Sequence, residues 1–298
     1  MSEIHTNHCT ACLSSDTNFY LNIKDHSISG EDFIINECSN CGFRFTSNPP
    51  EEIACGKYYQ SENYISHSDT KTGTISKVYH WVRNVMLGRK YYLLQSLDAN
   101  RNLLDVGSGT GYFPDFMQKK GYNVIGIEVD DTARNYSISK FGLNVLSPNQ
   151  LKNKEIKSTF GFVTLWHVLE HLYNPDEYMS LFSELLDANG YLIIAVPNHQ
   201  SHDAKTYKDF WAAYDVPRHL WHFSPKSLEV FAERNGFKLI KKELMPFDPF
   251  YNSLLSEKYK GGMLQFASGL FTGLIALIKG YLNVDHASSI IYILQKKA

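Results

Sequence analysis

Apolar runs and amphipathic segments alternate along the chain beyond residue 100. The runs are apolar at successive positions, as in strands covered on both sides, and they occupy residues 103–106, 123–129, 161–168 and 191–196. Residues 112–120 and 175–186 have helical character, the second with Asn174 as N-cap and Pro175 in its first turn. Strands and helices in alternation predict a parallel sheet with helices on both faces.

Three zones are expected along the chain. Residues 1–55 hold all five cysteines and short strand-like runs such as 32–38. Residues 56–100 are rich in tyrosine and then helical in pattern, and residues 101–298 carry the alternating strands and helices. The pattern therefore predicts a small β module, a helical linker and cap, and an α/β domain.

The composition is that of a globular protein, with 43% hydrophobic residues in a chain of 298. The net charge of −2 provides no overall basic field, so a nucleic-acid partner is not expected. The first 16 residues lack a positive segment followed by an apolar run, so no secretory leader is expected. A cytoplasmic location, with reduced cysteines, is the resulting prediction.

A glycine-rich loop follows the first strand of the α/β zone. Residues 103–112 read LLDVGSGTGY, with Gly107, Gly109 and Gly111 between a predicted strand and a predicted helix. Glycines there allow a tight turn and a close approach to a ligand at the carboxyl end of the sheet. A dinucleotide site would need a glycine where Tyr112 stands, and a P-loop would need Gly-Lys-Ser/Thr, which is absent.

The spacing D-x-G-x-G-x-G resembles motif I of class I S-adenosylmethionine-dependent methyltransferases. The segments WHVLEHLYNP at 166–175 and AVPN at 195–198 extend the resemblance, which is closest to bacterial small-molecule members. It implies a Rossmann-like, doubly wound, mostly parallel sheet with an antiparallel last strand. The second strand ends near Glu128, whose carboxylate can accept two hydrogen bonds from a ribose diol. The family often has Asp where Gly161 stands, which affects only a strand-start interaction.

The resemblance also implies S-adenosylmethionine as cofactor and a set of residues that bind it. These are Asp105, Gly107, Gly109, Gly111, Glu128, Val129, Leu165 and Trp166.

His167 follows the fourth strand, where methyl donor and acceptor are expected to meet. It is a candidate general base because histidine titrates near neutral pH, or it only lines the wall of the site. Glu170 and His171 are expected to form a structural pair. In ubiquinone-biosynthesis-like members a related E-x-x-E-H element is linked to a divalent metal, but His167 replaces its first acid, so no metal is expected there.

A second constellation lies at residues 209–224, where Arg218, His219 and His222 stand among five aromatic side chains. Elements after the fifth strand bind the acceptor in this family. The segment therefore either walls the acceptor pocket and supplies a base or an anionic anchor, or it is satisfied packing. His219 and His222 both remain candidate bases.

Two C-x-x-C pairs lie in the N-terminal module, at Cys9 and Cys12 and at Cys38 and Cys41. Four thiolates satisfy a tetrahedral zinc ion and leave no open position, so a structural zinc ribbon is predicted, with redox disulfides as the alternative. Cys55 is expected to be unpaired. A similar module precedes the catalytic domain in some sugar C-methyltransferases.

The linker offers further candidates for the ligand pocket or for packing. These are Tyr58, Tyr59, Tyr64 and His67, with Arg83 as either a partner of the cofactor carboxylate or a surface ion pair.

An apolar insertion is expected at 246–286, between a sixth strand at 237–244 and the last strand at 289–297. It contains the uncharged run 261–278, which as a helix would span about 27 Å, short of the ~30 Å hydrocarbon core. A full crossing would separate the last strand from its sheet. Peripheral membrane contact, dimerisation and packing over the acceptor pocket remain the alternatives.

These observations favour methyl transfer to a small-molecule, sugar or lipid-linked acceptor. An RNA or protein methyltransferase that docks through the ribbon and a non-catalytic cofactor-binding protein remain as alternatives.

Overall fold

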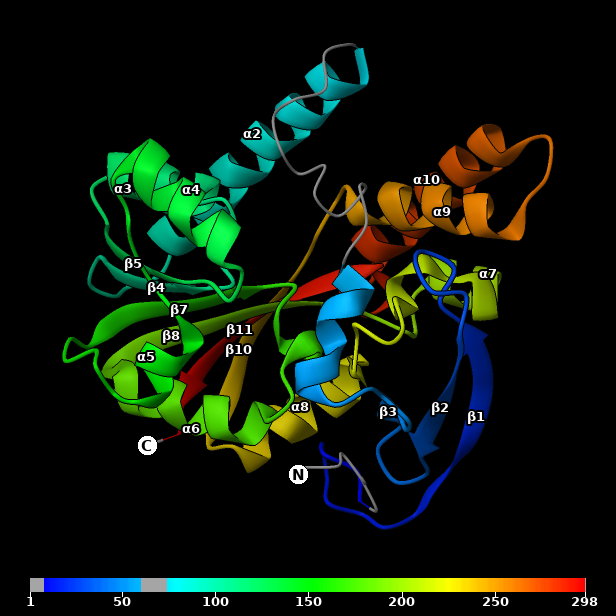
Figure 1. The fold of residues 1–298 in the computed structure, drawn as a ribbon, viewed down its shortest axis with the longest axis horizontal. Helices are drawn as coiled ribbons and strands as arrows, with labels where there is room; N and C mark the ends of the chain where they lie inside the picture. Colours follow the sequence, from blue (N-terminus) through cyan, green and yellow to red (C-terminus); the bar gives the residue numbers. More distant parts are fainter. Residues whose placement is uncertain (1–7, 60–73, 298) are drawn as a thin grey trace.

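The computed structural model describes residues 8–59 and 74–297 (Figure 1). A seven-stranded sheet with the order β10-β11-β8-β7-β4-β5-β6 forms its centre. Its strands are β4 (Asn102–Val106), β5 (Asn123–Ile127), β6 (Asn144–Leu146), β7 (Phe160–Trp166), β8 (Leu186–Pro197), β10 (Phe237–Leu244) and β11 (Ser289–Lys296). Only β11 runs antiparallel to its neighbours. The predicted mostly parallel sheet with an antiparallel last strand is confirmed.

Helices cover both faces of this sheet, as Figure 1 shows. They are α2 (Thr74–Gln95), α3 (Tyr112–Lys119), α4 (Asp131–Phe141), α5 (Pro148–Lys152), α6 (Pro175–Leu185) and α8 (Pro225–Arg234). One apolar core joins α2 and α3 to one face, and another joins α5, α6 and α8 to the opposite face. This arrangement is the predicted doubly wound architecture.

The sequences of β7 and β8 explain where these two strands lie and where they begin. All but the last residue of β7 are buried, as expected for a strand covered on both sides. A Cβ on Gly161 would stand 2.2 Å from the Asn100 carbonyl oxygen, so glycine is required at this strand start. β8 begins at Leu186 rather than at 191, because Leu186 already pairs with Phe160 before a bulge.

A second, four-stranded antiparallel sheet has the order β1-β2-β3-β9. Its strands are β1 (Thr17–Lys24), β2 (Asp32–Cys38), β3 (Arg44–Thr46) and β9 (Trp221–His222). The last strand comes from the α/β region, and Arg44 pairs with His222. Phe43 of the N-terminal module stacks on Trp221 and packs against Phe223 within the larger core. The N-terminal module and the α/β region therefore share one sheet and one core.

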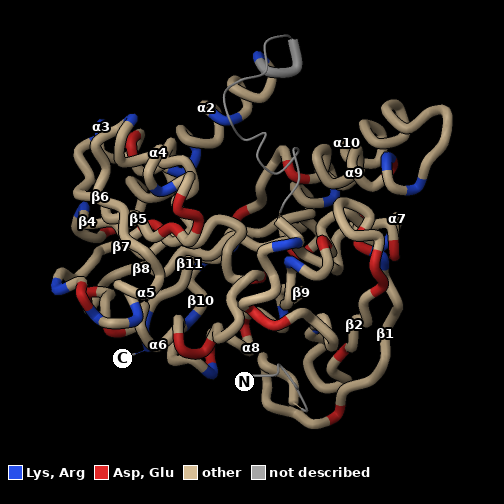
Figure 2. The backbone as a smooth tube through the Cα atoms, in the orientation of Figure 1, with Lys and Arg blue, Asp and Glu red and all other residues tan. Residues whose placement is uncertain are grey.

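The segment between β10 and β11 forms a helical hairpin of α9 (Asp248–Lys260) and α10 (Gln265–Leu282), which projects from the sheet in Figure 1. Small residues of α10 face α9: a Cβ on Gly269 would stand 2.9 Å from the Leu254 side chain, and one on Gly273 2.8 Å from Phe250. α10 is long and apolar enough to cross a membrane by length and composition. Only 22% of it is buried within the protein, so it is not a core helix. Figure 2 shows that its chain carries few charges.

Candidate functional site

The glycine loop joins β4 to α3 and has left-handed backbone at Gly107 and Gly111, with φ of 74° and 85°. A Cβ at Gly107 would lie 2.3 Å from Val168 Cγ2, and one at Gly111 would lie 2.6 Å from Ser137 Cβ. Both the conformation and the close approach therefore require glycine. The middle glycine, Gly109, faces open space and presents its backbone at the carboxyl edge of the sheet.

Glu128 directly follows β5 and holds this loop. Its carboxylate accepts hydrogen bonds from the Gly109 amide at 2.6 Å and from the Asp130 amide at 2.9 Å. Burial raises the pKa of Glu128, against the effect of those two amides. The next residue, Val129, is 76% exposed. A buried carboxylate can accept hydrogen bonds from ribose hydroxyls, and the exposed apolar side chain beside it can pack against the attached base.

Asp105 and Lys90 place opposite charges beneath the loop. Asp105 is buried and accepts a hydrogen bond from Thr164 Oγ1 at 2.7 Å. Lys90 of α2 lies with its Nζ 4.1 Å from the centre of the Trp166 ring. Burial raises the pKa of Asp105 and lowers that of Lys90, because each charge is costly away from water.

The sequence did not single out Lys90, since a lysine in an amphipathic helix has no distinctive spacing. Arg83, the residue proposed from the sequence, packs over the Tyr112 ring at 3.7 Å and contacts His80 Nδ1. Of the other expected cofactor residues, Leu165 is fully buried, and Trp166 is partly buried with no hydrogen-bond partner for its Nε1 in the described residues.

His167 lies between two carboxylates at the end of β7. Its Nδ1 is 3.3 Å from Glu170 Oε1, and its Nε2 is 3.0 Å from Asp248 Oδ2. Burial alone would lower the pKa of His167, but the two carboxylates outweigh burial and raise the pKa to about 10. His167 has a left-handed φ of 57°, which turns the chain out of the strand. In this arrangement the imidazole is protonated at neutral pH.

Asp248 is the first residue of α9, so the apolar insertion contributes a charged side chain to this edge of the sheet. Asp248 could not be singled out from the sequence, because it is distant from His167 in the chain and belongs to no motif.

Glu170, His171 and His219 form a neighbouring cluster in which Glu170 is fully buried and His171 is partly buried. One ligand atom from each lies within 4.8 Å of the others. Nδ1 of His171 is 3.0 Å from the Arg218 carbonyl oxygen, and Nδ1 of His219 is 2.8 Å from that of Ala213. Burial and the nearby His219 lower the pKa of His171 to about 4. In the described structure the two histidines therefore bond to backbone carbonyl groups. Glu170 and His171 belong to a larger cluster and do not form a pair by themselves.

The 209–224 segment joins the two sheets. Arg218 is buried and donates hydrogen bonds to Asp215, Asp25 and the Tyr58 carbonyl oxygen. His222 is only 4% exposed, and its Nε2 lies 3.3 Å from Thr46 Oγ1. Of the three candidate bases, His167 lies beside the glycine loop, whereas His222 lies in the segment that joins the two sheets.

The candidates in the linker have different surroundings in the structure. The hydroxyl of Tyr58 donates to Glu31, and that of Tyr59 lies 3.2 Å from His171 Nδ1. Tyr64 and His67 lie outside the described residues.

The four cysteines of the two C-x-x-C pairs converge. Cys9 and Cys41 sulfurs are 3.5 Å apart, those of Cys12 and Cys38 are 3.6 Å apart, and all four lie within 4.8 Å of one another. Zinc–sulfur bonds of about 2.3 Å in a tetrahedron place sulfurs about 3.8 Å apart. The cluster fits a zinc ion with every position filled by sulfur. The Asn40 side-chain amide donates to Cys12 Sγ, a contact that would orient and stabilise a thiolate ligand.

Comparison with known proteins agrees with this geometry. A sequence model described as a methyltransferase domain matches residues 79–242, more than half of the chain. The ubiquinone biosynthesis O-methyltransferase of Pelagibacter ubique (strain HTCC1062) is 28% identical over 175 residues, which are 52% of this chain and 68% of that protein.

Solved structures show the same fold. The magnesium protoporphyrin IX methyltransferase of Synechocystis PCC 6803 with bound SAH has a TM-score of 0.53 at 11% identity, covering 83% of this chain and all of that one. A putative sarcosine dimethylglycine methyltransferase from Galdieria sulphuraria has a TM-score of 0.51 at 12% identity, covering 74% and 88% of the two chains.

Proposed function

Because the chain belongs to the methyltransferase-domain family and is an S-adenosylmethionine-dependent enzyme, we propose that it methylates a small-molecule, sugar or lipid-linked acceptor. When bound, S-adenosylmethionine would supply a methyl group to a lone pair of the acceptor, which would lose a proton in exchange. The similarity to a ubiquinone biosynthesis O-methyltransferase supports a small-molecule acceptor, and the Gly109 amide held by the Glu128 carboxylate at the loop edge supports the cofactor site.

The chain's own residues divide the task of holding the cofactor. Glu128 would receive the ribose hydroxyls, and Val129 would pack on the adenine. The amino-acid end carries an ammonium and a carboxylate, which are complementary to Asp105 and Lys90 respectively. Trp166 would close the wall beside them. Positioning and exclusion of water provide most of the rate acceleration in such a displacement.

His167 is the candidate best placed to handle the acceptor proton. A third of its side chain is exposed, and it stands at the carboxyl end of β7. In the resting arrangement it holds a proton between Glu170 and Asp248. To act as a base it must first lose that proton, so a role in orienting or neutralising an anionic acceptor is the more direct use of this charge.

We further propose that the enzyme works in the cytoplasm at an anionic membrane surface. The outward face of α10 and the turn before it expose large apolar side chains: Met263, Leu264, Phe266, Phe271, Leu274, Ile278, Tyr281 and Leu282. The exposed charges from 258 to 282 are Lys258, Lys260 and Lys279, with no exposed acid. An apolar face rimmed by lysines matches anionic lipid headgroups over an acyl layer.

Calorimetric titration with S-adenosylhomocysteine, with NAD as the control, tests the cofactor site. Micromolar binding of the first alone is expected, and NAD binding would contradict the proposed reading of the loop. An acceptor screen with isotope-labelled methyl donor then separates the acceptor classes. Label in polyprenyl or glycolipid compounds would support a lipid-linked acceptor, whereas label only in RNA or protein would contradict the proposal.

A further inference from the structure

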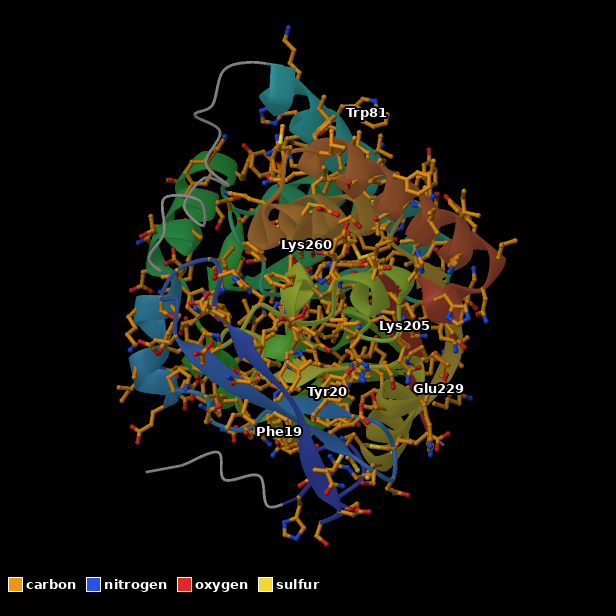
Figure 3. All side chains as sticks on the ribbon, turned by 90° about the vertical axis from the view of Figure 1, so that its right-hand side faces the viewer. Phe19, Tyr20, Trp81, Lys205, Glu229 and Lys260 are labelled. Carbon is orange, nitrogen blue, oxygen red and sulfur yellow. The ribbon has the colours of Figure 1, made fainter. Side chains whose placement is uncertain are left out.

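A pocket of about 770 Å³ lies between the N-terminal sheet and the segment that follows β8. Its lining comes from β1, β3, α7 (His202–Tyr207) and η3 (Lys208–Phe210) and includes Tyr20, Arg44, His199, Lys205, Lys208 and Asp209. It shares no lining residue with the glycine loop, Glu128 or His167. Its volume is in the range that holds a drug-sized or nucleotide-sized molecule. Figure 3 shows Tyr20 and Lys205 on the same side of the molecule.

The charged lining is mainly cationic. Lys205 and Lys208 are exposed, and neither forms an ion pair within the described residues. Arg44 is held rigidly, because its Nε donates to Glu37 Oε2 and its Nη1 donates to the Tyr214 hydroxyl. The remaining nitrogen, Nη2, has no partner among residues 8–59 and 74–297. The lining thus has three cationic side chains and one acidic side chain, Asp209, while Glu37 is already paired with Arg44. This balance of charge favours an anionic ligand.

His199 provides the second, independent observation. It is only 3% exposed and lines the pocket, and neither of its ring nitrogens makes a hydrogen bond of good geometry in the described structure, although the Gly42 backbone lies close enough to act on its pKa. An unpartnered buried polar group costs free energy, so such a group calls for a ligand. Burial and the charges of Arg44 and Lys205 lower the pKa of His199, so the neutral ring offers one N–H donor.

Tyr20 adds an aromatic surface at the rim. The Arg44 guanidinium lies 3.5 Å from the centre of its ring, and Tyr20 is still 39% exposed. An aromatic ring supported by a cation on one face can stack a planar group on the other.

We propose that this pocket binds an organic phosphate, with the phosphoryl oxygens at Arg44, His199 and Lys205 and a planar group on Tyr20. Guanidinium and ammonium groups are the usual partners of phosphoryl oxygens, and a neutral imidazole N–H completes the set. The pocket is a binding site separate from that of the methyl donor.

Calorimetry on the full zinc-loaded chain tests the proposal with pyrophosphate, uridine diphosphate and uridine as probes. Binding of both phosphates and not of uridine is expected. A tighter uridine diphosphate complex would assign a role to the stacked base, and equal affinities would assign the binding to the phosphoryl group alone. Absence of binding by either phosphate at millimolar concentration would overturn the proposal.

Variants locate the site. The double variant Lys205→Gln/Lys208→Gln should weaken phosphate binding at least tenfold, whereas Lys238→Gln, at an exposed lysine on β10, should leave it unchanged. Equal weakening by both would show nonspecific charge attraction and reject the site. The His199 ring resonances should shift on titration with phosphate, and unshifted resonances would likewise reject it. S-adenosylhomocysteine affinity, measured on the same variants, should not change, so failure of the pocket and failure of the methyl-donor site are distinguishable.

Discussion

Asp248 Oδ2 lies 3.0 Å from His167 Nε2, and this contact ties the helical hairpin of α9 and α10 to the end of β7. Glu170 holds the other ring nitrogen, so the imidazole is fixed at both ends. The hairpin therefore does more than cover the sheet. Together with Glu170, it raises the pKa of a histidine at the carboxyl end of β7, the edge proposed for methyl transfer.

The first prediction concerns the pH dependence of stability. The pKa of His167 is raised from 6.5 to about 10, so its stabilising contribution is complete below about pH 6.5 and is lost as the pH rises through 10. The free energy of unfolding should fall between pH 7 and 10, and His167→Gln should flatten that fall. Asp248→Asn should lower the His167 pKa in an NMR titration. An unchanged titration in Asp248→Asn would show that the contact does not form in solution.

The second prediction concerns Glu128. Glu128→Ala should weaken S-adenosylhomocysteine binding by about 1–3 kcal/mol, because charged hydrogen bonds to the ribose are lost. The calorimetric control is Glu184→Gln, which removes an exposed carboxylate paired with Lys154 on the surface. Thermal unfolding of both variants checks that the loop, which Glu128 also holds, remains folded. Wild-type affinity in a folded Glu128→Ala protein would remove this residue from the site.

The third prediction separates Lys90 from Arg83. Lys90→Met should weaken S-adenosylhomocysteine binding about tenfold or more, but leave binding of 5′-methylthioadenosine unchanged, because only the first ligand has the amino-acid carboxylate. Arg83→Met is the comparison variant. Loss of S-adenosylhomocysteine affinity in Arg83→Met and not in Lys90→Met would reverse the assignment.

The fourth prediction concerns zinc. Metal analysis should find one zinc per chain, and Cys38→Ser should lose it, whereas Cys55→Ser, at a buried cysteine outside the cluster, should retain it. Because Cys38 and Cys41 pack in one core with Trp221 and Phe223, chelation should lower the unfolding temperature of the whole chain. Native stability without metal would contradict a structural zinc. A second equivalent of zinc that survives Cys38→Ser would point to Glu170, His171 and His219.

The fifth prediction concerns the outward face of α10. The protein should sediment with vesicles that contain phosphatidylglycerol and much less with pure phosphatidylcholine. Phe266→Ser/Phe271→Ser should abolish sedimentation, whereas Ile53→Ser, at a 96% exposed apolar residue elsewhere, should not. Absence of vesicle binding together with a concentration-dependent dimer that the double variant disrupts would assign this face to self-association instead.

Features that are encoded by residues adjacent in the chain could be predicted from the sequence. The strand, glycine loop and helix at 103–119 are encoded by adjacent residues, because the turn needs glycine wherever the rest of the chain lies. The two C-x-x-C pairs are similar, since each knuckle forms within a few residues. The sequence by itself therefore determined the sheet class, the methyl-donor cofactor and the convergence of four cysteines.

Only the tertiary structure decided the environment of the charged side chains. Whether a histidine is charged or buried depends on residues far along the chain: the Asp248 carboxylate raises the pKa of His167, and Thr46 and β3 enclose His222. Lys90 interacts electrostatically with Asp105 because the packing of α2 on the sheet sets which helical position faces that carboxylate. Such contacts carry no local sequence signal, because burial and electrostatic pairing arise from packing between distant elements.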